Sequence, residues 1–226
     1  MVSSWARLDV SPFRLSGTVY GALLNHNSAL EALGSAVNAP PYGAPPRAPI
    51  LYIKPRNTLV GPGHAVEVPT GCDALEIGAC LGVVIGRTAS RLTPGTALDH
   101  VAGYLIVDDI SLPHASYYRP SLRFKARDGF CPMGAFVPRA VVADPDCLTI
   151  DTFVDDVRVA SASTAGAVRK VAQLLADVTD FMTLAPGDVL ATGVAAPAPR
   201  ARAGQAVRIE ITPLGSLRHT LVEEGA

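Results

Sequence analysis

The sequence has few charged residues and no surplus of either sign. Only 17% of its 226 residues are Asp, Glu, Lys or Arg, and the formal net charge is −1. Nucleic acids and anionic membranes are bound largely through clusters of positive charge, which this composition does not supply. We therefore expect no nucleic acid and no membrane as a partner.

Long apolar segments are missing as well. No run approaches the roughly 18 apolar residues of a membrane-spanning helix, and residues 1–17 lack the apolar centre of a signal peptide. The four cysteines (Cys72, Cys80, Cys131 and Cys147) form no CxxC pair and no zinc-finger spacing with a histidine. Free thiols in a reducing compartment are the simplest interpretation, so we expect a cytoplasmic protein.

The common catalytic signatures are also absent. The sequence contains no GxSxG, no HExxH, no P-loop and no GxGxxG. It therefore gives no support for a serine-hydrolase elbow, a zinc protease or a nucleotide-phosphate loop. The five histidines are scattered, and a single histidine is more often a hydrogen-bonded structural residue than a catalyst.

What the sequence does contain is a globular composition, with 49% hydrophobic residues, and many strand patterns. Apolar side chains alternate along residues 75–85, which predicts a strand with two distinct faces. Shorter apolar runs bounded by turns predict further strands. These lie at residues 50–54, 101–107, 148–154, 188–192 and 206–211.

Helix patterns are fewer. Apolar residues recur at helical spacing from Val168 to Met182, with Ser163 or Thr164 as the expected cap and Pro186 at the end. A shorter helix is expected at residues 28–33. Two proline-rich stretches, residues 39–49 and 195–203, predict loops. Many strands and one long helix indicate an α+β domain that is mainly β.

Two charged segments are candidates for a site. Asp108 and Asp109 stand at the end of a predicted strand, shortly before Ser111 and His114. Carboxylates in such a place can bind Mg²⁺ or Ca²⁺, although a solvated turn is the alternative. The second segment, KARDG at residues 125–129, is either part of a site or a charged surface turn.

Three segments resemble the fumarylacetoacetate hydrolase family. They are ILYIKPRNTLVGPG at residues 50–63, the stretch at residues 102–134, and FMTLAPGDVLATG at residues 181–193. The similarity extends from about Gly17 to Val222. It implies an N-terminal extension over residues 1–16 and a single family domain over residues 17–226. The expected fold is a mixed β-sandwich roll with a few helices packed outside.

Within the family, the chain resembles the isomerase/decarboxylases of 4-hydroxyphenylacetate (homoprotocatechuate) catabolism, which carry two fused copies of the fold. The motifs at residues 25–28, 54–58 and 111–113 resemble the amino-terminal copy. The resemblance implies an enzyme subunit acting on 5-carboxymethyl-2-oxo-hex-3-ene-1,7-dioate and 2-hydroxyhepta-2,4-dienedioate. It also implies a homodimer, or a heteromer with a metal-bearing paralogue.

The resemblance places the metal site on an incomplete set of residues. Active members hold a divalent ion with two Glu of a Glu-x-Glu strand and an Asp farther along. Asp109 falls on the Asp position, but Gly78 and Cys80 fall on the two Glu positions. Mg²⁺ or Mn²⁺ would thus lack two of its oxygen ligands, and a thiol suits softer metals. Glu76 could substitute only if the strand were shifted or bulged, because positions two apart are about 7 Å apart along a strand.

Site roles follow from the same resemblance. The expected catalytic residues are Lys125, Asp109, Asp128 and His26, and the expected substrate-binding residues are Arg119, Tyr118, Arg127 and Lys54. Two alternatives stay open. The chain is a non-catalytic partner of a metal-bearing paralogue, or it is a hydrolase of an acylpyruvate-like substrate. A hydrolase would need the His-Glu pair with which the family activates water, and this pair is absent.

Overall fold

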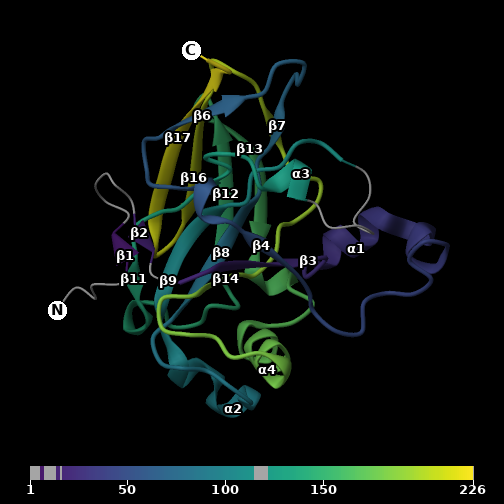
Figure 1. Ribbon diagram of the computed structural model, residues 1–226, viewed down its shortest axis with the longest axis vertical. Helices are drawn as coiled ribbons and strands as arrows, with labels where there is room; N and C mark the ends of the chain where they lie inside the picture. Colours follow the sequence, from purple (N-terminus) through teal and green to yellow (C-terminus); the bar gives the residue numbers. More distant parts are fainter. Residues whose placement is uncertain (1–5, 8–13, 16, 115–121, 226) are drawn as a thin grey trace.

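Two β-sheets form the body of the protein (Figure 1). The computed structural model describes residues 6–7, 14–15, 17–114 and 122–225. The larger sheet has the strand order β11-β9-β8-β14-β3-β4 and the smaller one β13-β12-β16-β17-β6. Each sheet mixes antiparallel pairs with one parallel pair, β14 with β3 and β17 with β6. The expected mainly β architecture with mixed sheets is therefore confirmed.

The strands of the larger sheet are β3 (Val19–Leu23), β4 (Ile50–Lys54), β8 (Ala79–Ile85), β9 (Val101–Asp108), β11 (Val137–Pro138) and β14 (Val189–Ala191). Those of the smaller sheet are β6 (Ala65–Val68), β12 (Thr149–Val154), β13 (Val157–Ser163), β16 (Ala206–Ile211) and β17 (Gly215–Glu223). Two-residue strands form three small pairs: β1 (Ala6–Arg7) with β2 (Arg14–Leu15), β5 (Leu59–Val60) with β10 (Cys131–Pro132), and β7 (Leu75–Glu76) with β15 (Arg200–Ala201).

The helices lie outside the sheets. They are α1 (Asn27–Leu33), α2 (Pro94–Ala97), α3 (Leu122–Lys125) and α4 (Val171–Phe181). Figure 1 shows α1, α2 and α4 at the periphery of the molecule. None of the helices in the described part of the chain is long and apolar enough to cross a membrane. The division at residue 17 between an extension and a family domain stays a prediction.

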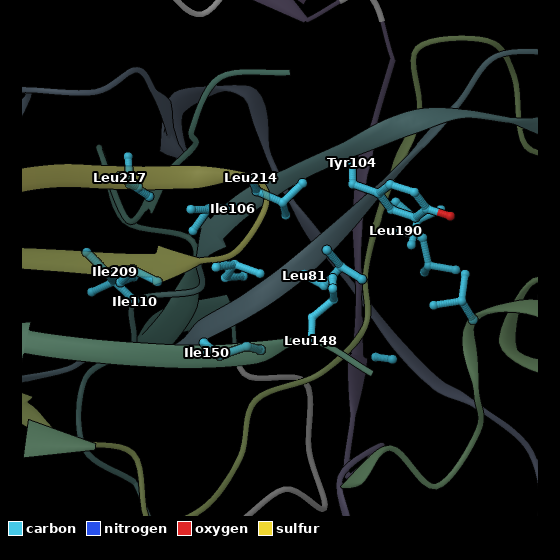
Figure 2. Close-up of a cluster of buried hydrophobic side chains, with 14 of the residues drawn as sticks. Leu81, Tyr104, Ile106, Ile110, Leu148, Ile150, Leu190, Ile209, Leu214 and Leu217 are labelled. Carbon is cyan, nitrogen blue, oxygen red and sulfur yellow. The ribbon is translucent and has the colours of Figure 1, made fainter. Parts of the chain in front are cut away.

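The main hydrophobic core lies between the two sheets. Figure 2 shows Leu81 and Ile106 of the larger sheet near Ile150 and Ile209 of the smaller one. All four side chains are buried. A second, smaller cluster covers the opposite face of β8 and includes Cys80. Strand β8 is therefore enclosed on both faces, which explains why its sequence is almost continuously apolar.

The single strand predicted over residues 75–85 is wrong, because the chain breaks at Ile77 and Gly78. Residues before the break form β7, which pairs with β15, and residues after it form β8 in the larger sheet. The backbone N–H of Gly78 donates to Asp108 Oδ1 at 2.7 Å. At Gly78, this bond to a side chain takes the place of a backbone bond between strands. It marks the point where the chain leaves the β7–β15 pair and enters the larger sheet as β8. The predicted loop at residues 195–203 likewise contains the short strand β15.

The long helix begins later than predicted. Ser163 accepts a hydrogen bond from the backbone N–H of Ala165, but this caps a 3₁₀ turn, Thr164–Gly166. The helix itself starts at Val171, whose backbone N–H donates to Asp146 Oδ1 at 2.9 Å. Val168, counted on the apolar face in the prediction, is 39% exposed. The short predicted helix at residues 28–33 is confirmed by α1.

Candidate active site

A cavity of about 370 Å³ opens where the end of β9 meets β4, β7 and the loop before β15. Its polar lining is formed by Tyr52, Glu76, Asp109, Ser111, His114, Lys125 and Arg200. Ala29 and Ala32 of α1 and the segment from Val194 to Ala198 complete the wall. The volume suits a small organic ligand, and the wall is mainly apolar with a few polar groups, as in most small-molecule sites.

Asp109 lies at the centre of the polar side of this cavity. Its side chain is 2% exposed, and both carboxylate oxygens have partners. Lys125 Nζ is 2.7 Å from Oδ2, and the Tyr52 hydroxyl donates to the same oxygen. Lys54 Nζ is 2.7 Å from Oδ1. Two ammonium groups and a phenol therefore surround one buried carboxylate.

The charges around Asp109 determine its ionisation. Burial by itself raises the pKa of the carboxyl, but the positive charges of Lys125 and Lys54 outweigh burial and hold this pKa well below its usual range. Burial and the adjacent Asp109 charge raise the pKa of the Tyr52 phenol well above its usual value. Asp109 is therefore ionised and Tyr52 protonated across the physiological range.

Lys54 is buried beneath the cavity wall and is bonded to the backbone around the site. Its ammonium donates to the backbone carbonyls of Ile110, Lys125 and Phe130 at 2.9, 2.9 and 2.8 Å. These three bonds use all three ammonium hydrogens, so the contact with Asp109 is an ion pair rather than a fourth hydrogen bond. Lys54 is 3% exposed and the cavity is lined by Lys125 instead. Lys125 is thus the lysine placed to reach a ligand.

Gly78 and Cys80, the two positions that the resemblance aligns with the Glu pair of the family, are poorly suited to hold a metal. A β-carbon built on Gly78 would lie 2.2 Å from the backbone oxygen of Asp109, so any side chain there would require the backbone to move. The Cys80 side chain is fully buried in the smaller apolar cluster. Burial, followed by the Asp109 charge, raises the pKa of the Cys80 thiol well above its usual value. A protonated, enclosed thiol is a poor metal ligand.

These residues do not fit a divalent ion. Asp109 Oδ2 already accepts from Lys125 and Tyr52. Asp109 Oδ1 is buried beside the Lys54 ammonium, without a hydrogen-bond donor among the described residues. A cation next to Asp109 would be repelled by the two ammonium groups. Within residues 17–114 and 122–225, no three His, Cys, Asp or Glu side chains are grouped as a metal site would require. Glu76 is oriented toward Arg200, whose Nη2 is 3.1 Å from Glu76 Oε1. The cavity therefore has the chemistry of an anion site.

His114 and Ser111 form a second polar group on the cavity wall. His114 Nδ1 lies 2.9 Å from the carbonyl oxygen of Leu112 and 3.2 Å from Ser111 Oγ. The imidazole stacks on the Phe124 ring with the centroids 4.9 Å apart. A carbonyl oxygen only accepts, so the short contact favours the tautomer with hydrogen on Nδ1. These contacts hold the imidazole in one orientation.

The structure brings only some of the predicted site residues together. Lys54, Asp109 and Lys125 form one cluster. His26 caps α1 and lines a different, smaller hollow with Asn25 and Thr192.

Two further predicted residues lie elsewhere. Asp128 accepts a hydrogen bond from Asn57 at 2.6 Å. With Arg127 and Glu224, it lines a separate surface hollow. Tyr118 and Arg119 lie outside the described residues. The catalytic and substrate-binding roles assigned to all eight positions stay predictions.

Sequence reasoning missed Tyr52 and Arg200. Tyr52 carried a usable signal, because it stands two positions before Lys54 in a predicted strand and so shares its face. Its ring also needs Gly21, where a β-carbon would lie 2.1 Å from the ring. Arg200 carried none, because it belongs to a stretch predicted as a loop. Its place depends on the β7–β15 pairing, in which Arg200 stands opposite Glu76.

Comparison with known proteins places this geometry in a family. The family model for the fumarylacetoacetate hydrolase C-terminal region matches residues 18–222. A 4-hydroxyphenylacetate degradation bifunctional isomerase/decarboxylase from Salmonella dublin is 39% identical over 210 residues, which are 93% of this chain. The aligned part is 48% of that protein, so the chain spans about half of its length.

Two solved structures share the fold. A 2-hydroxyhepta-2,4-diene-1,7-dioate isomerase from Mycobacterium marinum has a TM-score of 0.77 and 26% identity over 95% of this chain and 79% of that one. A maleylpyruvate hydrolase from Sphingobium sp. SYK-6, in complex with manganese(II) and pyruvate, has a TM-score of 0.71 and 25% identity over 91% and 70%. These similarities confirm the resemblance seen in the sequence: the chain belongs to the fumarylacetoacetate hydrolase family.

Proposed function

We propose that this chain is a subunit of an isomerase/decarboxylase in 4-hydroxyphenylacetate catabolism, and that its own site serves the isomerisation. The substrate would be 2-hydroxyhepta-2,4-dienedioate, formed from 5-carboxymethyl-2-oxo-hex-3-ene-1,7-dioate by decarboxylation. The observation that carries the proposal is the buried Lys125–Asp109 pair, 2.7 Å apart, at a cavity whose described residues form no group of three metal-ligating side chains. The pathway is supported by the relative named as a 4-hydroxyphenylacetate degradation isomerase/decarboxylase, and the substrate class by the structure named as a 2-hydroxyhepta-2,4-diene-1,7-dioate isomerase.

Isomerisation requires only a proton transfer. The enol O–H loses its proton, the C2–O bond becomes a carbonyl, the two double bonds become one at C3–C4, and C5 gains a proton. Negative charge grows on the enol oxygen during this step. The buried Lys125 ammonium, held in place by Asp109, would stabilise that charge. His114, on the same wall, would exchange the proton, since an imidazole can both accept and donate one.

Decarboxylation makes a greater demand on the site. Loss of carbon dioxide leaves an electron pair that must be delocalised onto the 2-oxo group, and a chelated divalent ion supplies the Lewis acid for this in metal-bearing relatives. Gly78, Cys80 and the engaged Asp109 leave no oxygen ligand set for the ion. We therefore assign decarboxylation to a different, metal-bearing copy of the fold. The correspondence of this chain to the amino-terminal copy of the fused relatives stays a prediction.

A second candidate function is that of a non-catalytic partner. The observation in its favour is the complete engagement of Asp109 by Lys54, Lys125 and Tyr52, which leaves no carboxylate oxygen without a donor or a cation. In that case the chain would pack against a metal-bearing paralogue and stabilise it. A homodimer is the other assembly consistent with family membership.

The deciding experiment is a ketonisation assay on the purified chain. Loss of the conjugated dienol absorbance is followed with excess EDTA, and the buffer rate is subtracted because the dienol also ketonises unaided. Acceleration by the wild type that persists in EDTA is expected. Lys125→Ala should lose at least tenfold in kcat/KM, since an oxyanion donor typically contributes more than that.

The matched control is Lys170→Ala, which removes the one lysine that is exposed and outside the cavity. It should retain the wild-type rate. A wild-type rate equal to that of buffer, both alone and mixed with a metal-bearing paralogue, would eliminate the catalytic proposal. If the paralogue then gained stability or activity on mixing, the non-catalytic partner would be supported instead.

A further inference from the structure

Two cationic side chains line the cavity at separate places. Lys125 belongs to α3 and lies beside Asp109, whereas Arg200 belongs to β15. Lys125 is 6% exposed, whereas the Arg200 side chain is 59% exposed. One cation is thus deep and the other is at the solvent-facing side. Lys125 enters the proposed function, but Arg200 has no role in it.

Backbone hydrogen bonds connect these two places. Arg200 stands opposite Glu76 in the antiparallel β7–β15 pair. Glu76 in turn forms a backbone bridge with Ser111, with bonds of 2.8 and 3.1 Å. Ser111 follows Asp109 by two residues. Adjacent strands are about 4.8 Å apart, so Arg200 lies roughly 10 Å from Ser111 at the backbone. Arg200 is therefore separated from the backbone segment that carries Asp109 by two strand-to-strand distances.

The side chain of Arg200 is oriented as well. Its Nη2 donates to Glu76 Oε1 at 3.1 Å, and the Glu76 side chain is only 20% exposed. A guanidinium has five N–H donors, and this bond uses one of them. Exposed ion pairs contribute little to stability, so the pair biases the direction of the guanidinium without fixing it, and Arg200, which lines the cavity, keeps its other donors for a ligand there.

We infer that Arg200, oriented by Glu76, binds the second carboxylate of a dicarboxylate whose first end lies beside Lys125. The inference rests on the proposed function and deepens it by naming the group that selects diacids. An extended seven-carbon diacid separates its carboxyl carbons by about 7–8 Å, from carbon–carbon bonds near 1.5 Å. We expect such a ligand to extend from the buried cation, Lys125, to the exposed one, Arg200, since both line the same cavity. Arginine also suits the task, because its planar donors match a carboxylate in a bidentate manner.

Glu76 has a positioning role in this arrangement. An unpaired carboxylate on the cavity wall would repel an anionic ligand, whereas pairing with Arg200 cancels that charge. The free N–H groups of the guanidinium then remain for the ligand. Arg200 also lines the neighbouring hollow that contains Arg202, so the guanidinium stands at the boundary between the two spaces.

The test compares two stable ligands by calorimetry. 2-Oxoheptanedioate carries both carboxylates, and 2-oxoheptanoate lacks only the distal one. The wild type is expected to bind the diacid ten- to a hundredfold more tightly, as one charge-assisted bidentate contact would give. Arg200→Ala and Arg200→Gln should reduce this preference to threefold or less, with affinity for 2-oxoheptanoate unchanged. Glu76→Gln should reduce it partly.

Arg202→Ala is the matched control, because Arg202 lies outside the Asp109 cavity. It should keep the full preference, and thermal midpoints should show that every variant is folded. If both Arg200 variants retain the preference, or if the folded wild type has none, the inference fails while the proposed function stands. If the wild type binds neither ligand, or if Lys125→Ala leaves both affinities unchanged, the proposed function fails and the inference falls with it.

Discussion

Gly78 faces Asp109 so closely that a β-carbon at position 78 would lie 2.2 Å from the Asp109 carbonyl oxygen. Real β-carbons do not approach backbone oxygen to that distance, so the local backbone depends on glycine. By the family resemblance, position 78 is one of the two positions expected to carry a metal-binding Glu in active members. The backbone around Gly78 therefore leaves no space for a carboxylate side chain at this position.

Restoring the two carboxylates should not restore metal binding. We expect the double variant Gly78→Glu/Cys80→Glu to bind neither Mg²⁺ nor Mn²⁺ at micromolar concentration in calorimetry. Gly78→Ala alone should lower the free energy of unfolding by about 1–3 kcal/mol through overpacking. Gly95→Ala is the control, because the nearest atom to its β-carbon is 3.9 Å away. A tight metal site in a folded double variant would show that the backbone adapts.

Asp109 should contribute strongly to stability at neutral pH. Its folded pKa is held below the ordinary value, so this contribution is complete above the unfolded pKa near 4. It is lost as the pH falls below about 4 toward the folded pKa. Asp109→Asn leaves two buried ammonium groups beside a neutral amide. We expect a loss of about 3–5 kcal/mol at pH 7 and a smaller difference from the wild type at pH 3.

Urea unfolding at pH 7, 5 and 3 measures this effect. Asp99→Asn serves as the control, since its ion pair with Arg139 is exposed and exposed pairs contribute little. A loss from Asp109→Asn that is equal at all three pH values would argue that the ionised carboxylate is not its cause.

Strands could be predicted from the sequence where a short apolar run is flanked by turn residues. Residues 50–54 and 206–211 were predicted with the bounds that β4 and β16 have, because turn residues flank short apolar runs. The break between β7 and β8 was not, because alternation continues through Ile77 and Gly78. What breaks the strand is the Asp108 side chain, which is distant in sequence. Local periodicity contains no information about such a bond.

The site was predictable in part for the same reason. Asp109 and Lys125 were found through their family motifs, and the structure places their charged atoms 2.7 Å apart. The ionisation of Asp109 also depends on the nearby Lys54 ammonium. Lys54 is held there by hydrogen bonds to three backbone carbonyls that are distant from it in sequence. His26 was aligned to a family position, yet its ring caps α1 and contacts the Ser163 carbonyl. Motif order alone therefore does not decide which side chains reach the cavity.

The four cysteines should differ sharply in reactivity. Cys147 is exposed and Cys72 is half-buried, whereas Cys80 and Cys131 are enclosed in the core. Burial raises the pKa of the Cys131 thiol to about 12 and that of Cys80 well above its usual value. Since the thiolate is the reactive form, both core thiols should be inert in the native state.

Titration with a thiol-specific disulfide reagent tests these positions. We expect one fast thiol, one slower thiol and two that react only after unfolding. Cys147→Ser should remove the fast phase alone. Rapid native-state reaction of Cys80 would mean that position 80 opens to the cavity, and the argument against a metal ligand there would weaken.

A buried pair behind the cavity should stabilise the contact between the two sheets. His219 Nε2 on β17 lies 2.7 Å from Oδ2 of Asp108, at the end of β9, and both side chains are fully buried. Asp108 Oδ1 also accepts the Gly78 N–H. His219→Phe would leave the carboxylate buried without this partner, so we expect a loss of about 3–5 kcal/mol in the free energy of unfolding.

A double-mutant cycle separates the loss of the Asp108–His219 interaction from the steric effect of the phenylalanine ring at position 219. Asp108→Asn/His219→Phe should cost less than the sum of the two single variants, by about 1–3 kcal/mol, because the unpaired charge is then absent. His64→Phe, at an exposed histidine, should change stability by less than about 0.5 kcal/mol. Strict additivity of the two single losses would mean that the sheets are held by apolar packing alone, and that the Asp108 bond to Gly78 does not depend on His219.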